Sequence, residues 1–506
     1  MTSVWILGDQ LTPTGSALEG LRPDQCVLVM VESLARGRQL AYHKHKLILL
    51  WAAMRHFRDE MRGLGYTVDY YEAQPDFGTA LKDHVQTHRP TQMRLMEASE
   101  YGVTERLTAA VEELGVPIEI TPNTQFVCRR DEVNRRDFPI MEDFYRHVRR
   151  KTGLLMEGNK PAGGQFNYDA LNREKPPKGH VFPHTPAIPP DAITREVMEF
   201  VAREFPDNFG RADTFWWPTT RAEAESLRDH FLDDRLDMFG PYEDASVRGE
   251  RSLYHSLLSA LMNLGLLDPL ETCRAAEARW RNGTARLPSV EGYVRQIIGW
   301  REYVRLYYWE AMPDLDAVNY FEAEEPLPAF YTSGETDMAC LRESVLTLRD
   351  YGTTHHIQRL MILGNFALIL GVRPQAIRDW FWLAYADAYD WVVTPNVLAL
   401  SQYADGGTAH GGLATKPYAS AAAYVNRMSD YCGKCRYDPK KSVGEDACPY
   451  NALFWDFHQR HEAKFRPNPR LRNLLLGLDR RTSEQRQASE ARADDLRARL
   501  RAGERV

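Results

Sequence analysis

The chain has little that would mark it as a membrane or secreted protein. Among its 506 residues no apolar run approaches the roughly 18 residues that span a bilayer. The start, MTSVWILGDQL, has no basic leader and reaches Asp9 and Gln10 before an apolar signal segment develops. The seven cysteines are an odd number without the spacing of a disulfide framework. We therefore expect a soluble, cytoplasmic, monomeric protein in which clustered cysteines bind metal.

The chain also has no excess of positive charge, since 70 Asp and Glu outnumber 63 Lys and Arg and the formal net charge is −7. This excludes a diffuse polycation of the histone kind, but it leaves room for a local basic face on an acidic body. The sequence has no internal repeat. Its hydrophobic content of 43% and charged content of 26% are ordinary for a globular protein, and its length exceeds what one core usually organises. We expect two domains.

Short apolar runs alternate with amphipathic stretches from the start to about residue 122. Strands are predicted at 4–7, 26–31, 68–71, 93–96 and 118–120, and helices at 43–64, 77–87 and 104–114. This βαβ pattern predicts a Rossmann-like parallel sheet in an α/β domain over 1–130. Gly8-Asp9 follows the first strand, at the edge where open α/β sheets bind ligands, although a turn that simply ends the strand fits equally well.

The rest of the chain changes character three times. Residues 131–200 are rich in Pro, Gly and Asn and are interpreted as a connector between the domains. Residues 201–460 have helical periodicity and many Trp and Tyr, which predicts an all-α second domain. The tail, 461–506, has few apolar positions, so we expect a solvated helix or a frayed end.

Three cysteines form the most specific motif, in YCGKCRYDPKKSVGEDACPYNAL. Cys432 and Cys435 form a C-x2-C pair, and Cys448 returns after an irregular loop and is followed by proline. Such a pair places two thiolates on one turn, and Cys340 is the candidate fourth ligand. The spacing alone does not distinguish zinc from iron–sulfur. However, no second C-x2-C is present, and the Cys-Pro pair is typical of iron–sulfur loops.

Around these cysteines the chain resembles a known family. The stretches that carry the resemblance are ACLRESVLTLRDYGTTHHIQRLMILGNFALI, WFWLAYADAYDWV, SQYADGG, TKPYAS, YVNRMSDYCGKCRYDP and CPYNAL, with GDQL, RRKTGLLM, FPDNFG and VEGYVRQIIGWREY elsewhere. Together they are similar to the bacterial iron–sulfur photolyase/cryptochrome family, whose characterised members are prokaryotic (6-4) photolyases. The resemblance implies an N-terminal antenna domain, a C-terminal helical FAD-binding domain, and a [4Fe-4S] cluster on Cys340, Cys432, Cys435 and Cys448.

The resemblance also implies residues for flavin and lesion. It places a flavin phosphate contact in YHSLLS, with His255, Ser256, Leu257 and Ser259, although a polar helix start explains this segment as well. Arg359 and Asp387 match flavin-contacting positions. Two adjacent histidines cannot face the same way; the resemblance assigns His356 to the lesion as general acid, with His355 as its supporting partner. Other positions near the substrate pocket are Gln296, Trp300 and Tyr418.

For electron transfer the resemblance implies Trp380, but the neighbouring positions depart from the family. Phe381 replaces a more easily oxidised Tyr, and Thr332 replaces a Trp, so the outer route is open to Trp382, Trp391 or Tyr331. Simple packing explains each of these aromatic residues individually.

The antenna site departs too. Arg36 stands where the family has an acidic residue, while Asp9 and Gln10 remain. The first expectation is 6,7-dimethyl-8-ribityllumazine, and the second is another chromophore or none.

We expect the partner to be UV-damaged DNA, held by a basic rim of residues 146–151, Arg173, Lys175 and Lys178, although charge runs are more often a solvated face. Asp169 and Asn172 are candidates for Mg²⁺. The expected function is light-dependent repair of (6-4) photoproducts by electron transfer from photoexcited reduced FAD. The alternatives are a blue-light receptor of the cryptochrome type without repair activity, and a redox or structural DNA-binding protein.

Overall fold

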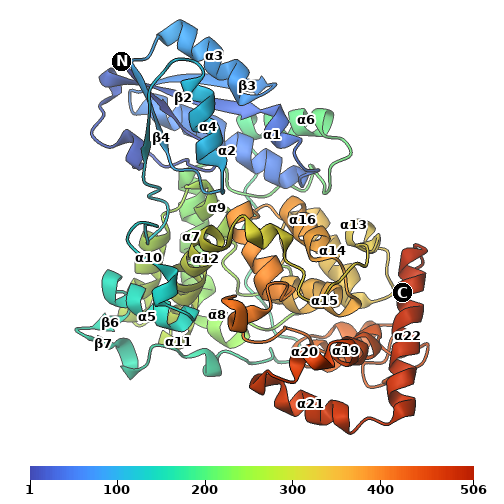
Figure 1. Ribbon diagram of the computed structural model, residues 1–506. Helices are drawn as coiled ribbons and strands as arrows, with labels where there is room; N and C mark the ends of the chain where they lie inside the picture. Colours follow the sequence, from blue (N-terminus) through green and yellow to red (C-terminus); the bar gives the residue numbers. More distant parts are fainter.

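The computed structural model describes residues 1–506, in which a small sheet region lies on a larger helical region (Figure 1). All neighbouring strands of the five-stranded sheet run parallel, in the order β3-β2-β1-β4-β5. The strands are β1 (Thr2–Trp5), β2 (Cys26–Ser33), β3 (Thr67–Gln74), β4 (Gln92–Met96) and β5 (Ile118–Thr121). The Rossmann-like parallel sheet predicted from the sequence is confirmed.

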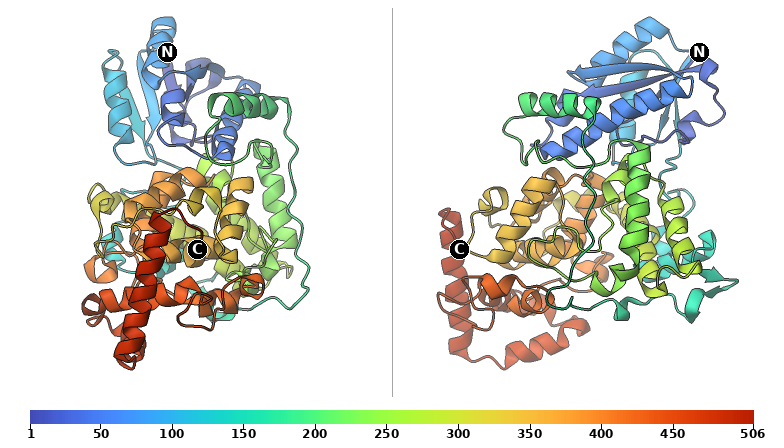
Figure 2. Two further views of the ribbon diagram at one scale, coloured as in Figure 1. Left: turned by 90° about the vertical axis from the view of Figure 1, so that its right-hand side faces the viewer. Right: turned by 180° about the vertical axis from the view of Figure 1, so that it is seen from behind.

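Helices cover both faces of this sheet, which is why the residues of β2 are buried along its whole length. The helices are α1 (Leu34–Gly37), α2 (Lys44–Gly63), α3 (Phe77–His88) and α4 (Val103–Glu112). Helix α2 and one sheet face join the core of the helical region, whereas α3 and α4 close a separate small core on the other face. Figure 2 shows α3 on the side remote from the helical region.

The segment 131–200 contains structure of its own. Helix α5 (Met141–Thr152) and the short strands β6 (Met156–Glu157) and β7 (Lys160–Pro161) lie with the helical region, while α6 (Ala192–Glu204) packs on α2 beside the sheet. The segment therefore runs from the sheet region to the helical region and back.

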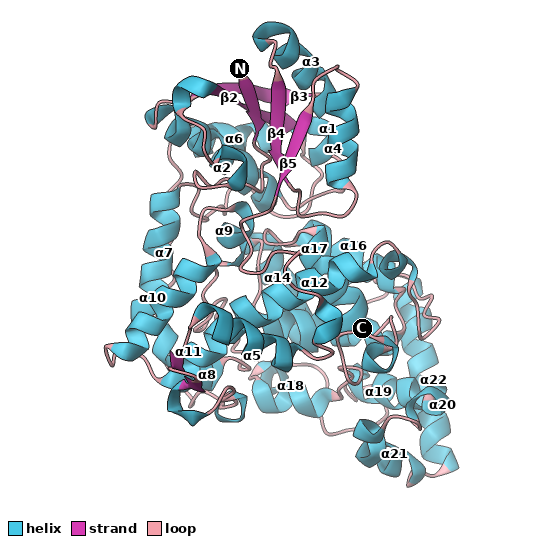
Figure 3. Ribbon diagram, turned by 60° about the vertical axis from the view of Figure 1, so that its left-hand side comes forward, coloured by secondary structure: helices cyan, strands magenta, loops and turns pink.

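The second region is helical, as predicted (Figure 3), and no helix has the length and apolar character required to cross a membrane. Three π-helical turns interrupt its helices: η6 (Arg295–Arg301), η8 (Gln358–Gly364) and η9 (Pro395–Ser401). Its α-helices are α7 (Arg221–Asp234), α8 (Leu236–Tyr242), α9 (Ser259–Leu264), α10 (Pro269–Arg281), α11 (Leu287–Val294), α12 (Glu302–Ala311), α13 (Phe330–Ser333), α14 (Ala339–Tyr351), α15 (Asn365–Leu370), α16 (Pro374–Ala384), α17 (Asp390–Thr394), α18 (Ala422–Met428) and α19 (Pro449–Arg460).

The tail is helical, but the expectation that it is solvated or frayed is wrong. It forms α20 (Glu462–Phe465), α21 (Arg472–Asp479) and α22 (Ser483–Arg501), and α22 packs along α19. Leu496 is fully buried, and the buried Arg497 forms an ion pair with Asp456 of α19. Small residues at the contact let two helices approach closely, so few large apolar positions are needed.

Candidate functional site

The structure brings the four motif cysteines to one pocket. Cys340 lies in the first turn of α14, Cys432 and Cys435 lie at the short helix η11 (Tyr431–Lys434), and Cys448 caps α19 at its N-terminus. They line a pocket whose other walls are apolar or aromatic: Met338, Ala422, Val425, Tyr431, Tyr437 and Tyr450. The ends of three helices meet at this point and bring together cysteines that lie far apart in the sequence.

Both the spacing and the protonation of these thiols bear on what they bind. Asp69, His84 and His88 are the only three His, Cys, Asp or Glu side chains that converge closely enough for a single ion, so the sulfur atoms stand farther apart than a mononuclear site requires. In a tetrahedral zinc site sulfur atoms lie about 3.8 Å apart. Burial raises the pKa of Cys448 to about 12 and that of Cys432 to about 11. The donor set therefore fits a polynuclear cluster that offsets the thiolate charge.

A second set of polar groups gathers around Arg359, on the π-turn η8. Its guanidinium contacts both carboxylate oxygens of Asp387, at 3.0 and 3.1 Å, and Ser259 donates to the same carboxylate at 2.6 Å. Burial opposes the charge of Asp387, but Arg359 and Ser259 hold its pKa below the usual value. π-turns are frequent at functional sites because they redirect side chains out of the regular helical register.

The segment before α9 completes this site with strained backbone and unpaired atoms. Leu253 and Leu257 have φ values of 43° and 61°, a region that branched residues rarely occupy outside ligand clamps. The Nε2 atom of His255 is buried without a hydrogen-bond partner. Burial is the main cause that lowers the pKa of His255 to about 3, so its ring is neutral. An unpartnered ring nitrogen beside an Arg–carboxylate pair fits a polar cofactor such as FAD.

The two adjacent histidines point in different directions, as expected. His355 is buried and stacks on His255 with ring centroids 5.0 Å apart, and its Nε2 atom lies 3.2 Å from the Ser246 hydroxyl. His356 is accessible to solvent, but the surrounding protein and the Arg359 guanidinium lower the pKa of its imidazole to about 4. His355 therefore contacts the flavin-side segment, and His356 is left free for a substrate.

Hydrogen bonds connect His355 to the wall of the cysteine pocket. The Tyr431 hydroxyl accepts from Ser246 at 3.1 Å and from the Gln358 amide at 3.1 Å. Gln358 in turn accepts from the backbone N–H of His355 at 3.3 Å. Tyr431 directly precedes Cys432, so the backbone and ring of His355 are both held by a residue of the cysteine motif.

Gln296 and Tyr418 have different surroundings. Gln296, on the π-turn η6, donates to Glu243 at 2.8 Å, and burial raises the pKa of Glu243 to about 7. Tyr418 packs against Ile357 and Leu360, next to His356 in the chain. Trp300 is half-buried on η6.

The candidate electron carriers do not form one group. Trp380 is buried, its ring lies edge-on to Tyr331 at 4.9 Å and to Tyr385 at 6.2 Å, and Arg359 lies 4.1 Å over the Tyr385 ring. Trp391 packs instead against Phe126, and Trp382 is half-buried near Arg378. From Tyr331 the ring contacts continue through Phe330 and Phe366 to Tyr450, at the cysteine pocket.

At the carboxyl edge of the sheet, Asp9 and Gln10 lie beside the ion pair between Arg36 and Glu100, 2.6 Å apart. Burial and the Glu100 carboxylate raise the pKa of Asp9 to about 6. Gln10 donates to two backbone carbonyls, while its own side-chain oxygen is buried without a partner. This orphaned acceptor fits a ligand with N–H groups.

The basic rim needs one correction. Arg149 is fully buried and donates to the carbonyls of Leu154 and Phe166, so it is structural and does not face DNA. Arg173, Lys175 and Lys178 are exposed, as a rim requires.

Both carboxylate oxygens of Asp169 are engaged by arginines, Arg173 and Arg295. The Asn172 amide is buried against Gly240 and Gly292. The Asn172 Oδ1 atom is buried without a hydrogen-bond partner, while Asp169 would have to leave its two arginines to bind an ion, so the Mg²⁺ site stays a prediction.

Sequence reasoning missed Tyr385, Glu100 and Tyr431. Glu100 follows β4, and its position at the carboxyl edge of the sheet was readable from the strand pattern. Tyr385 and Tyr431 lie within recognised motifs, but their contacts depend on the tertiary fold.

Comparison with known proteins gives four findings. Residues 4–217 match the family of deoxyribodipyrimidine photo-lyase-related proteins. The (6-4) photolyase of Agrobacterium fabrum is 42% identical over 499 residues, which cover 97% of this chain and 98% of that protein. A class III photolyase structure from Agrobacterium tumefaciens has a TM-score of 0.60 at 14% identity, covering 99% and 98% of the two chains. The Synechocystis cryptochrome has a TM-score of 0.58 at 13% identity, covering 99% of each.

Proposed function

The chain belongs to the family of bacterial (6-4) photolyases, and from this premise we propose that it repairs pyrimidine (6-4) photoproducts in UV-damaged DNA by a light-dependent reaction. Membership confirms the family resemblance and the two-part photolyase fold expected from the sequence. The family implies FAD as the flavin. When bound and excited in its reduced state, FAD supplies the electron that opens the lesion.

Residues of the helical region hold the flavin, donate the proton and contact the lesion. Arg359, Asp387, Ser259 and the segment of His255, Ser256 and Leu257 hold the flavin, and the positive charge of Arg359 stabilises negative charge on it. His356 donates the proton that is required when the hydroxyl group of the lesion migrates. His355 orients the backbone segment that carries His356. Gln296 and Tyr418 contact the flipped-out bases.

A proton on His356 needs added negative charge, because the pKa of its imidazole is about 4 in the free protein. The DNA phosphates that accompany the lesion supply such charge and raise this pKa. The proton therefore arrives with the substrate, so the DNA-free protein does not carry an imidazolium beside the Arg359 guanidinium.

We assign a [4Fe-4S] cluster to Cys340, Cys432, Cys435 and Cys448. The wide separation of the sulfur atoms and the apolar walls of their pocket support this assignment over zinc. The cluster is expected to join α14, η11 and α19.

We place an antenna chromophore at Asp9 and Gln10. The lumazine is the first candidate and another chromophore the second, because Arg36 is neutralised by Glu100. Exposed Arg173, Lys175 and Lys178 would contact DNA phosphates.

The observation that carries the repair function is the accessible His356 beside the Arg359–Asp387 pair. The test is photorepair of an oligonucleotide with one (6-4) lesion, in light and in darkness, with a cyclobutane-dimer oligonucleotide as control. We expect repair of the (6-4) lesion in light only. In His356→Ala the repair should be abolished while flavin content and affinity for damaged DNA stay near wild type. A wild-type protein with fully reduced flavin that leaves the lesion intact would instead be a light receptor.

A further inference from the structure

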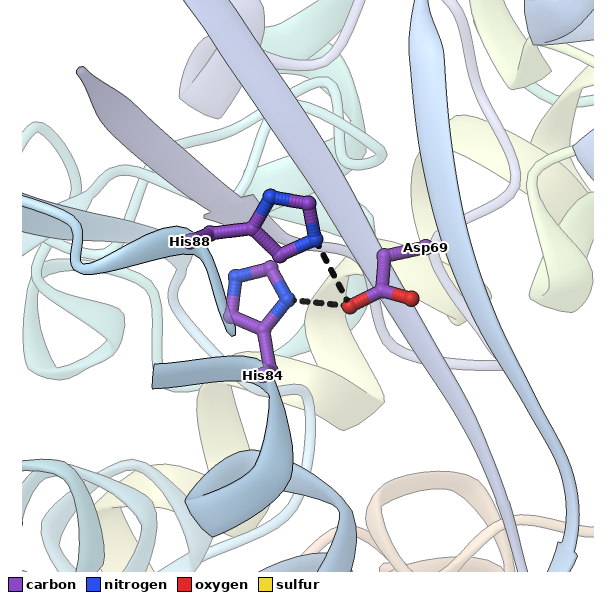
Figure 4. Close-up of side chains that lie close together, drawn as sticks. All are labelled: Asp69, His84 and His88. Atoms are coloured by element: carbon purple, nitrogen blue, oxygen red, sulfur yellow. Dashed lines mark hydrogen bonds and ion pairs between the residues drawn. The ribbon is translucent and has the colours of Figure 1, made fainter. Parts of the chain in front are cut away.

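A cluster of metal-ligating side chains lies far from the flavin and cysteine sites, on the outer face of the sheet. Asp69 is on the edge strand β3, and His84 and His88 are on α3, which covers it. Figure 4 shows the two imidazoles directed at one carboxylate oxygen. His84 Nδ1 lies 2.6 Å and His88 Nε2 lies 3.2 Å from Asp69 Oδ2. We propose that Asp69, His84 and His88 bind one divalent transition-metal ion of the zinc class.

The spacing follows from the helix. Residues four apart on a helix lie on one face, so His84 and His88 present their rings side by side, with centroids 4.8 Å apart. Ligand atoms of a tetrahedral zinc ion with bonds near 2.0 Å stand about 3.3 Å apart. The contact of His88 with Asp69 already has this length. The contact of His84 is shorter by less than 1 Å, and the Asp69 side chain, which is 24% exposed, has room to shift and lengthen it.

A partner behind the site orients His84. This ring is fully buried, and its Nε2 atom lies 2.8 Å from the Ser3 hydroxyl on β1. When Nε2 donates its hydrogen to Ser3, the Nδ1 lone pair faces Asp69 and is free for a metal. Histidines that bind metals generally donate their second ring hydrogen in this way.

The negative charge around Asp69 also favours a bound cation. Asp69 forms ion pairs with these two histidines and with no lysine or arginine. A second carboxylate is close, because Tyr71 donates to Asp83 at 3.0 Å and also lies within hydrogen-bond reach of Asp69. A divalent ion would neutralise the excess negative charge.

The types of ligand and the solvent exposure of the site indicate which metal it binds. Two imidazoles and one carboxylate suit zinc, cobalt, nickel or copper, whereas calcium and magnesium prefer oxygen ligands. Asp69 and His88 are 24% and 22% exposed, so an ion can enter from solvent and complete its coordination with water. Such an ion would fasten the edge strand β3 to α3.

The experiment is equilibrium dialysis of the purified holoprotein against zinc chloride, with zinc and iron measured together by mass spectrometry. We expect one zinc per chain in addition to an unchanged iron content, and no displacement by excess magnesium. His88→Ala and Asp69→Asn should each lower zinc affinity at least about tenfold, since even loss of a supporting partner costs 10–100-fold. His230→Asn is the matched control, because His230 also pairs with a carboxylate four residues away, Asp234, but has no second histidine.

A second measurement guards against a folding defect. Zinc should raise the melting temperature of wild type and of His230→Asn, but not that of His88→Ala. The proposal is overturned if wild type binds no stoichiometric zinc, or if both His88→Ala and Asp69→Asn bind it as wild type does.

Discussion

Tyr431 offers the sharpest test of how the cysteine pocket supports the histidines. Tyr431→Phe keeps the ring that lines the pocket and removes only the hydroxyl, which accepts from Ser246 and from Gln358. Tyr431 is 1% exposed, so water cannot replace the lost partner. Each lost hydrogen bond costs about 1 kcal/mol, giving about 2 kcal/mol for the pair. Ser246 and Gln358, which lose this partner, are the residues that hold the ring and the backbone N–H of His355.

The direct assay is hydrogen exchange of the peptide that covers 353–359. A loss of 2 kcal/mol corresponds to roughly thirtyfold faster exchange, because each 1.4 kcal/mol is a factor of ten. Repair should fall as well, by about tenfold to a hundredfold, since small displacements of catalytic groups have effects of that size. Iron content should not change. Tyr437→Phe is the control, because Tyr437 lines the same pocket but forms no hydrogen bond to the His355 network. Unchanged exchange in Tyr431→Phe, or equal effects of both variants, would refute the reasoning.

Four further predictions follow from the geometry. Cys448→Ala should lose iron and labile sulfide together, measured by colorimetric assay; stoichiometric zinc without sulfide in the fresh wild-type protein would contradict the cluster. Trp380→Phe should slow flavin photoreduction sharply and Tyr331→Phe should slow it less, whereas Phe381→Tyr should leave it unchanged or faster; equal absorbance transients in all variants would remove Trp380 from the route. The affinity for damaged DNA should fall as pH rises from 5 to 8, by at most about tenfold per unit, because the pKa of His356 is about 4 in the free protein and is raised in the complex, so that binding takes up a proton. His356→Asn should flatten that profile, and an identical slope in both proteins would exclude His356 as the group. Arg497→Met should destabilise the chain by about 3 kcal/mol, because the buried Asp456 keeps only Arg460 as a partner; an unchanged denaturation midpoint would mean that α22 adds nothing to stability.

The sequence was sufficient where chemistry or periodicity is local. The apolar run CVLVMV predicts a buried strand because its residues are apolar on both faces, and the C-x2-C spacing predicts a shared turn. Adjacent residues cannot both face the same way, so the sequence predicted that His355 and His356 diverge; the assignment of His356 to the substrate came from the family resemblance and stays a prediction. These features need no knowledge of distant contacts.

Long-range contacts explain what the sequence could not predict. Arg149 belongs to a basic run that looks solvated, yet its guanidinium satisfies the carbonyls of a loop that only the fold brings near. The tail has too few apolar residues to predict burial, but Ala493 and Ser489 allow close approach to α19 and Arg497 finds a buried carboxylate. The role of Tyr385 depends on Arg359, which is adjacent only in space.

The arrangement of the cysteines has a consequence for how the protein is made in the cell. Cys340 is translated well before Cys448, and at about 5–20 residues per second roughly 5 to 20 s separate them. The helix α22, which packs on the helix following Cys448, is translated later still. During this interval the Cys340 thiol has neither its partners nor its buried pocket and is open to oxidation. Delivery of the cofactor is therefore expected to follow translation of all four ligands, and expression under oxygen should favour chains that fold without it.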